Sequence, residues 1–286
     1  MIGANQPLID DKEYYLHVAA EEKKHGRTQS TSLQAVVFDL YEKYLDRVMD
    51  KDGPKTESKI SESDQIILSD HAYYLKLVHF KGLRGRILDS TPWRKCPYCY
   101  QIKATEVDHY LPRSKFGEYS IYAPNLVPIC KTCNGKKLNR YAHPGGGRRF
   151  LHPYFDKLPE TPHPHLTAKV SVGVSVFIRF MVTKSPGMSE EVWSVHSNQF
   201  DELELATRYA DEAIENITGM LYSLRRHFSD GGGTQVAEHL MIERVSKEKT
   251  YGPNHWWPVM LGALVASREF CDGGFNVMDP EGVALA

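Results

Sequence analysis

Two matched cysteine pairs, Cys96-Pro97-Tyr98-Cys99 and Cys130-Lys131-Thr132-Cys133, decide the fold of the middle of this chain. Each pair has the spacing that lets two thiolates bind one metal ion, and two such pairs thirty residues apart can complete a tetrahedral four-thiolate zinc site. The loop between the pairs contains the dipeptide Asp108-His109, which is typical of metal-dependent hydrolases. The sequence therefore predicts a structural metal site and a reaction centre in one short module.

The order of residue types in this module resembles that of the zinc-stapled HNH endonucleases of stand-alone bacterial type, members of the ββα-metal nuclease superfamily. The resemblance covers residues 93–140, about a sixth of the chain. It rests on Cys96, Cys99, Asp108, His109, Pro112, Ser114, Asn125, Leu126, Pro128, Cys130, Cys133, Asn134 and Lys137. What the resemblance implies is hydrolysis of a nucleic-acid phosphodiester bond.

The resemblance also implies a role for four residues. His109 falls at the position of the general base, Asp108 at the metal ligand before it, and Asn125 at the asparagine that braces the intervening loop. The histidine that ends the family's motif is replaced by Asn134, as it is in the HNH domain of CRISPR effectors. One carboxylate and one amide oxygen then remain as ligands, a set that suits Mg²⁺ or Mn²⁺ better than a second zinc ion.

Charge is distributed unevenly along the chain. The formal net charge is only −1, but residues 81–150 hold fourteen Lys or Arg against four Asp or Glu, and the remaining 216 residues carry −11. A basic module in acidic surroundings is the pattern expected of phosphate contact, although a solvated lysine-rich face is the alternative. The candidates for contact with the DNA backbone are Arg113, Lys115, Lys131, Lys136, Lys137 and Arg140.

Composition indicates an ordinary globular protein, with 286 residues of which 41% are hydrophobic and 25% are charged. No apolar run approaches the length that spans a bilayer, and the first residues lack the features of a signal peptide. We therefore expect a cytoplasmic protein with no membrane partner, in which paired thiols bind metal rather than form disulfides. Cys271 stands alone and is expected to be a small buried residue.

The predicted fold class is α+β, a mainly helical chain around a central zinc-stapled ββα-metal module. The expected domains are an N-terminal helical region at 1–92, the nuclease module at 93–157, and a C-terminal strand pair with helices at 158–286, used for packing or for binding a partner. Apolar spacing predicts helices at 11–24, 32–49, 63–79, 200–228, 236–247 and 255–270. Residues 166–182 alternate in a way that predicts a hairpin turning at Gly173.

Within the module, the sequence predicts strands at 106–111 and 125–128 and a helix at 134–140. Neighbouring residues on a strand face opposite sides, so Asp108 and His109 can reach one phosphate only if a bulge or loop interrupts the hairpin. The loop histidines His152, His163 and His165 are expected at the surface rather than as metal ligands.

Three functions remain open on this pattern. The first is a Mg²⁺-dependent endonuclease acting on DNA, of the kind used in phage defence or restriction and helped in such systems by a companion ATPase or sensor protein. The second is a zinc-stapled nucleic-acid-binding protein that does not cut, against which the set of Asp108, His109 and Asn134 argues. The third is a nuclease directed at RNA, since the chemistry requires only a phosphodiester.

Overall fold

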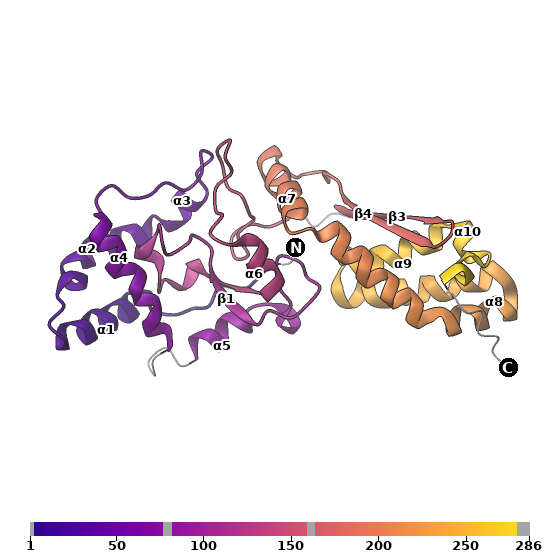
Figure 1. The fold of residues 1–286 in the computed structure, drawn as a ribbon, viewed down its shortest axis with the longest axis horizontal. Helices are drawn as coiled ribbons and strands as arrows, with labels where there is room; N and C mark the ends of the chain where they lie inside the picture. The colour runs from indigo at the N-terminus through magenta and orange to yellow at the C-terminus, as the bar shows by residue number, and fades with distance from the viewer. Residues whose placement is uncertain (1–2, 77–81, 159–163, 279–286) are drawn as a thin grey trace. The chain divides into compact units, whose positions relative to one another are not determined.

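The computed structural model describes residues 3–76, 82–158 and 164–278. Over these ranges the chain is mainly helical and contains two small antiparallel sheets, which confirms the predicted α+β class (Figure 1). It divides into two compact units. Unit 1 contains Met1–Leu158 and Glu190–Leu203, and unit 2 contains Pro159–Ser189 and Glu204–Ala286. The N-terminal helices and the cysteine-bearing module therefore belong to the same unit.

Unit 1 begins with helix α1 (Asp11–Lys24), which has the predicted bounds. The Asp10 carboxylate accepts a hydrogen bond of 3.0 Å from the Glu13 amide and so caps the first turn. Lysines in the last turn complement the negative end of the helix dipole. The cap and the charges explain why local sequence was sufficient to place this helix.

The predicted helix at 32–49 is instead two helices, α2 (Gln29–Glu42) and α3 (Tyr44–Val48), which meet at Lys43. The side chain of Tyr44, directly after the break, is buried and reaches Asn125 in the cysteine-bearing module. The predicted helix at 63–79 is α4 (Glu62–Asp70) followed by a 3-10 helix (His71–Lys76), and residues 77–79 lie outside the described residues.

Helix α5 (Leu83–Leu88) precedes the module, which contains the antiparallel strands β1 (Glu106–His109) and β2 (Leu126–Ile129). Their register runs from Glu106 opposite Ile129 to His109 opposite Leu126 without a bulge. Helix α6 (Lys131–Lys137) follows β2 and begins three residues before the prediction, because the Cys130 thiol caps it by accepting from the Cys133 amide at 3.4 Å. It ends at Leu138, whose φ of +51° leaves the helical region.

Helix α7 (Glu190–Glu202) returns to unit 1 after the chain has formed part of unit 2. The Arg149 guanidinium donates to both carboxylate oxygens of Glu202, at 2.6 and 2.8 Å. The buried Arg148 pairs with Asp156 at 2.6 Å and with Glu191 at 3.0 Å. In the first pair a single N–H group, Arg149 Nε, is shared between two carboxylate oxygens, and in the second one guanidinium bridges two acids. These partly buried ion pairs attach α7 to residues 148–156.

Unit 2 contains the predicted hairpin, formed by β3 (Leu166–Val172) and β4 (Val176–Val182). Helices α8 (Leu205–Tyr251), α9 (Trp256–Ala266) and α10 (Arg268–Cys271) and a 3-10 helix (Gly274–Met278) complete its described part. The predicted helix at 200–228 was wrong at its start, because Phe200 belongs to α7 and the chain turns at Glu204 with φ +52°.

Helix α8 is interrupted at Gly231 and Gly232, which are not helical, so the predicted helix at 236–247 is its second half. The stacked rings of His227 and His239, with centroids 4.1 Å apart, show that the chain folds back at this point. The predicted helix at 255–270 is divided between α9 and α10. In the described part of the chain, no helix is both long enough and apolar enough to cross a membrane.

Candidate active site and metal centre

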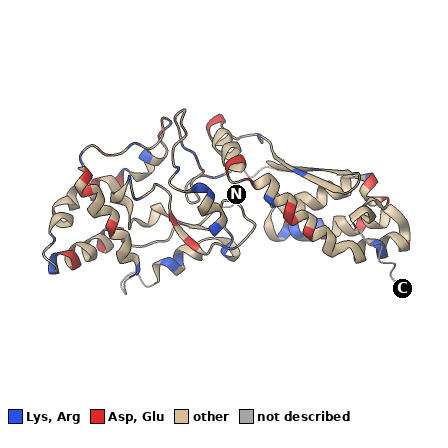
Figure 2. Cartoon of the chain, viewed as in Figure 1, with Lys and Arg blue, Asp and Glu red and all other residues tan. Residues whose placement is uncertain are grey.

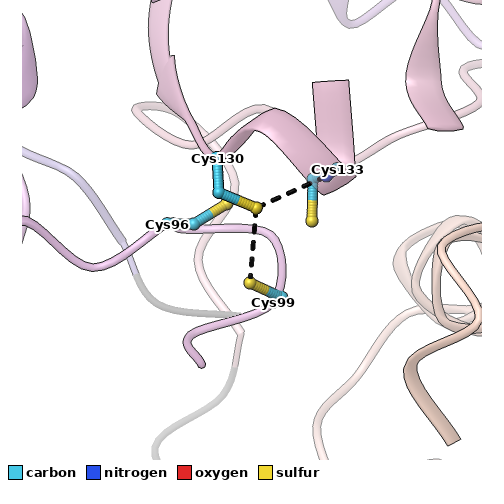
Figure 3. Close-up of side chains that lie close together, drawn as sticks. All are labelled: Cys96, Cys99, Cys130 and Cys133. Carbon is cyan, nitrogen blue, oxygen red and sulfur yellow. Dashed lines mark hydrogen bonds between the residues drawn. The ribbon is translucent and has the colours of Figure 1, made fainter. Parts of the chain in front are cut away.

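The four paired cysteines converge in the module, as Figure 3 shows. Their sulfur atoms all lie within 4.8 Å of one another, and the Sγ atoms of Cys99 and Cys130 are 3.9 Å apart. All four side chains are buried, and all five cysteines of the chain are free of disulfides. Four sulfurs bound about 2.3 Å from one zinc ion would be about 3.8 Å apart. The cluster therefore fits a closed structural zinc site.

Local backbone geometry builds each half of this cluster. Cys96 and Cys99 lie in a tight turn in which the Tyr100 amide donates to the Cys96 carbonyl at 2.7 Å, with Tyr100 at φ +50°. Cys130 and Cys133 lie at the cap and in the first turn of α6. Since β2 leads directly into Cys130, the cysteine cluster fixes where α6 begins relative to the two strands.

His109 is the last residue of β1, and a loop begins directly after it. Its Nε2 atom lies 2.8 Å from the carbonyl oxygen of Ser120. A carbonyl only accepts hydrogen bonds, so Nε2 carries the hydrogen and the lone pair of the neutral ring lies on Nδ1. Burial lowers the pKa of His109 below its usual 6.5, which favours the neutral ring. The geometry thus leaves Nδ1 as the proton acceptor.

Asn125 is fully buried and holds both ends of the loop that follows His109. Its Oδ1 accepts from the Leu111 amide at 2.8 Å, and its Nδ2 donates to the Leu111 carbonyl at 3.0 Å and to the Tyr119 carbonyl at 3.3 Å. Because Ser120 follows Tyr119 directly, these bonds also place the carbonyl that His109 contacts. This is the geometry of a residue that braces the loop.

Asp108 faces helix α6, where the Lys137 ammonium lies 2.8 Å from its Oδ2 atom. Lys137 also donates to the His109 carbonyl at 3.1 Å, and its side chain is only 1% exposed. The prediction that Lys137 contacts the DNA backbone is therefore corrected. The positive charge of Lys137 compensates the half-buried carboxylate of Asp108 and is not exposed at the surface, where DNA would bind.

Asn134 lies on the same helix and donates from Nδ2 to the Glu106 carboxylate at 2.8 Å. Sequence reasoning missed Glu106. The signal that could have found it is strand alternation, which places Glu106 on the same face of β1 as Asp108. Four polar side chains therefore meet between β1 and α6. Glu106 and Asp108 come from the strand, and Asn134 and Lys137 come from the helix.

Basic and acidic residues both occur along the described part of the chain, as the blue and red segments of Figure 2 show. The other predicted DNA contacts differ in how accessible they are. Arg113 donates to the Ser69 carbonyl at 2.9 Å, and Arg140 pairs with Glu202 at 3.3 Å. Lys136 is half-buried, whereas Lys115 and Lys131 are exposed. Part of the local positive charge is therefore neutralised by acids outside residues 81–150, and the two exposed lysines are the candidates best placed to meet a phosphate.

Two further residues that support the site carried no local sequence signal. The Tyr44 hydroxyl donates to Asn125 Oδ1 at 2.9 Å and lies 3.2 Å from His152 Nε2. His152 is fully buried against the Tyr110 ring, with centroids 4.2 Å apart, so its expected surface position was wrong. His165 is also buried, with 4% of its surface exposed, and His163 lies outside the described residues. Tyr44 thus contacts Asn125 directly, and His152 contacts Tyr44 in turn.

Comparisons with known proteins agree with this geometry. A family model described as HNH endonuclease matches residues 96–140. Protein ea31 of Escherichia phage lambda is 28% identical over 189 residues, which is 63% of this chain and 64% of ea31. Septu protein PtuB of Bacillus thuringiensis is 42% identical over 48 residues, which is 15% of this chain and 19% of PtuB. The chain thus matches less than two thirds of the length of either relative.

No solved structure is significantly similar to the chain. The segment that matches the family model contains the four cysteines, both strands of the hairpin, α6 and His109. Residues 96–140 of this chain therefore match the HNH endonuclease family model and contain a four-cysteine cluster that fits a structural zinc site.

Proposed function

We propose that this protein is a divalent-metal-dependent endonuclease that hydrolyses DNA phosphodiester bonds through His109. One observation carries the proposal above the others: the hydrogen bond from His109 Nε2 to the Ser120 carbonyl leaves Nδ1 as the proton acceptor of a neutral ring. A module that only bound nucleic acid would not need an imidazole that is buried, neutral and held in one orientation. The HNH endonuclease domain at 96–140 supports the same activity.

In the proposed reaction, His109 Nδ1 takes a proton from the attacking water while the Ser120 carbonyl holds the other side of the ring. Asn125 keeps the loop, and with it Ser120, in place through its three bonds to Leu111 and Tyr119. Asp108 and Asn134 would hold the Mg²⁺ or Mn²⁺ ion, since both offer hard oxygen ligands on the β1 face toward α6. The bound ion would neutralise charge on the phosphate and on the leaving oxygen.

Incubation of the purified protein with plasmid DNA, single-stranded DNA and RNA, each with and without Mg²⁺, tests the proposal directly. We expect Mg²⁺-dependent cleavage of DNA. Cleavage of RNA alone would support the alternative RNA-directed nuclease, and binding of all three without cleavage under any divalent ion would support the non-cutting alternative.

The ion assignment predicts a metal-dependent defect. Asp108→Ala or Asn134→Ala should reduce cleavage about 10²-fold at fixed Mg²⁺, because a bound ion supplies several kcal/mol of transition-state stabilisation. Raising the Mn²⁺ concentration should restore part of the rate, as read from Mn²⁺ titrations of cleavage. A wild-type rate that is independent of every divalent ion would disprove the assignment.

The charge distribution predicts where DNA is bound. Replacing the exposed Lys115 and Lys131 with Gln should weaken binding to all duplex sequences alike. The slope of log affinity against log salt should fall by roughly 0.9 for each phosphate that the protein no longer neutralises. Lys23→Gln with Lys249→Gln, at two exposed positions outside residues 93–157, serves as the matched control. An equal effect of the control pair would place the DNA surface elsewhere.

For the biological role, we propose phage defence or restriction, with a companion ATPase or sensor protein. The similarity to Septu protein PtuB supports this role for the module alone. Unit 2 is the proposed partner surface, and its exposed apolar side chains on α8, Tyr222 and Ile242, suit such a contact. Co-expression with the product of each neighbouring gene, followed by affinity capture and phage challenge, tests both parts of the proposal.

A further inference from the structure

Strand β1 and helix α6 are joined by two polar contacts of similar length. Asn134 Nδ2 donates to Glu106 Oε2 at 2.8 Å, and the Lys137 ammonium lies 2.8 Å from Asp108 Oδ2. Glu106 and Asp108 are two residues apart on the strand, and Asn134 and Lys137 are three apart on the helix, so each pair shares one face. Each proposed metal ligand is therefore held by a residue that has no assigned role in the reaction.

The contact between Glu106 and Asn134 decides which end of an amide faces the ion. An asparagine side chain presents a donor at Nδ2 and an acceptor at Oδ1, and rotation by half a turn exchanges them. A carboxylate only accepts hydrogen bonds, so it can contact Nδ2 and not Oδ1. A divalent cation binds the oxygen of an amide and is repelled by its NH₂ group.

We infer that Glu106 is a positioning residue, which holds the Nδ2 end of Asn134 and thereby directs Oδ1 toward the proposed ion site. Without Glu106, the amide can rotate and present its NH₂ group, and the ion loses one of its two protein ligands. The inference rests on the proposed function in taking Asp108 and Asn134 as ligands. It adds that the correct orientation of Asn134 is set before the ion binds.

Manganese affinity tests this inference without any cleavage assay. Zinc-loaded wild type, Glu106→Ala and Glu106→Gln would be titrated with Mn²⁺ while the free ion is followed by electron paramagnetic resonance. Removal of a residue that orients a metal ligand costs about 10- to 100-fold in affinity, so Glu106→Ala should bind Mn²⁺ at least about tenfold more weakly. A neutral acceptor makes a bond about half as strong as a charged one, so Glu106→Gln should lose only about threefold.

The same Glu106 substitution made in a second protein, Asn134→Asp, distinguishes whether Glu106 orients Asn134 or binds the ion itself. In Asn134→Asp, both oxygens of the new side chain can bind the ion, and no NH₂ group remains to be turned away. Adding Glu106→Ala to Asn134→Asp should then cost little Mn²⁺ affinity, because the orientation that Glu106 supplies is no longer needed. If Glu106 were itself a ligand, its removal would weaken binding equally in both backgrounds, and that result would overturn the inference.

Controls distinguish this inference from the proposed function and from misfolding. Glu42→Ala removes one exposed acidic charge from the same unit and should leave Mn²⁺ affinity unchanged. Zinc content and melting temperature should match the wild type in every variant, since Glu106 is only half-buried. If Asn134→Ala lost affinity but Glu106→Ala did not, the inference alone would be wrong. If the wild type bound no Mn²⁺, both the inference and the proposed ion site would be overturned.

Discussion

Replacing His109 with alanine should abolish cleavage while zinc content, melting temperature and DNA affinity stay close to wild type. The substitution removes the proton acceptor at Nδ1 and one hydrogen bond to the Ser120 carbonyl, but no ligand of the cysteine cluster. General-base catalysis contributes about 10²–10⁴-fold, and we expect a loss of that size in single-turnover cleavage of plasmid DNA. Unlike the cleavage rates of Asp108→Ala and Asn134→Ala, the cleavage rate of His109→Ala should not recover at high Mn²⁺.

The matched control is His143→Ala, which removes an exposed imidazole from the same unit. Its cleavage rate should equal that of the wild type. If His109→Ala kept more than a tenth of the wild-type rate, His109 would not be the general base. Another group would then have to accept the proton.

Replacing Cys96 or Cys130 with serine should cost the protein its fold rather than its chemistry alone. The hairpin and α6 are short, so the four-thiolate site supplies folding free energy that their packing cannot replace. Structural zinc binding is worth about 10–16 kcal/mol in small zinc-dependent domains. We expect a sharp fall in bound zinc by elemental analysis and a loss of soluble protein.

Cys271→Ser provides the control for loss of a buried thiol. Cys271 lies in α10 of unit 2, is not part of the cluster, and its thiol donates to the Leu264 carbonyl at 3.5 Å. This variant should keep its zinc and most of its stability. Wild-type protein with far less than one zinc ion per chain after gentle purification would contradict the structural zinc site.

The helices and strands that could be predicted correctly are those whose sequence signals lie within the element itself or at its ends. Helix α1 has a capping aspartate at its start and lysines at its end, and the first five residues of β4 alternate between buried and exposed positions. The boundary between α7 and α8 could not be found in the same way. Apolar residues continue past it with helical spacing, and contacts distant in sequence, such as the ion pairs of α7 with Arg148 and Arg149, join that helix to unit 1.

The residues of the candidate site also fall into two groups, those that a sequence motif reveals and those that it does not. The cysteine spacing and the Asp108-His109 pair were visible as motifs, because metal binding requires fixed residue types at fixed intervals. The role of Lys137 was not visible, since a lysine that faces solvent and one that pairs with a buried carboxylate look alike in sequence. Tyr44 lies 81 residues before its partner Asn125, and no local pattern reports a contact over that separation.

The return of α7 to unit 1 bears on how the protein is made. A ribosome releases the chain from its amino end, so the strands of unit 2 are synthesised before α7, although α7 completes unit 1. The acidic partners of Arg148 and Arg149 on this helix are therefore absent until residues 159–189 have emerged. A chain cut short after Leu158 would contain every cysteine of the cluster and the whole proposed reaction centre, but Arg148 would keep only Asp156 as an acidic partner and Arg149 would lose Glu202.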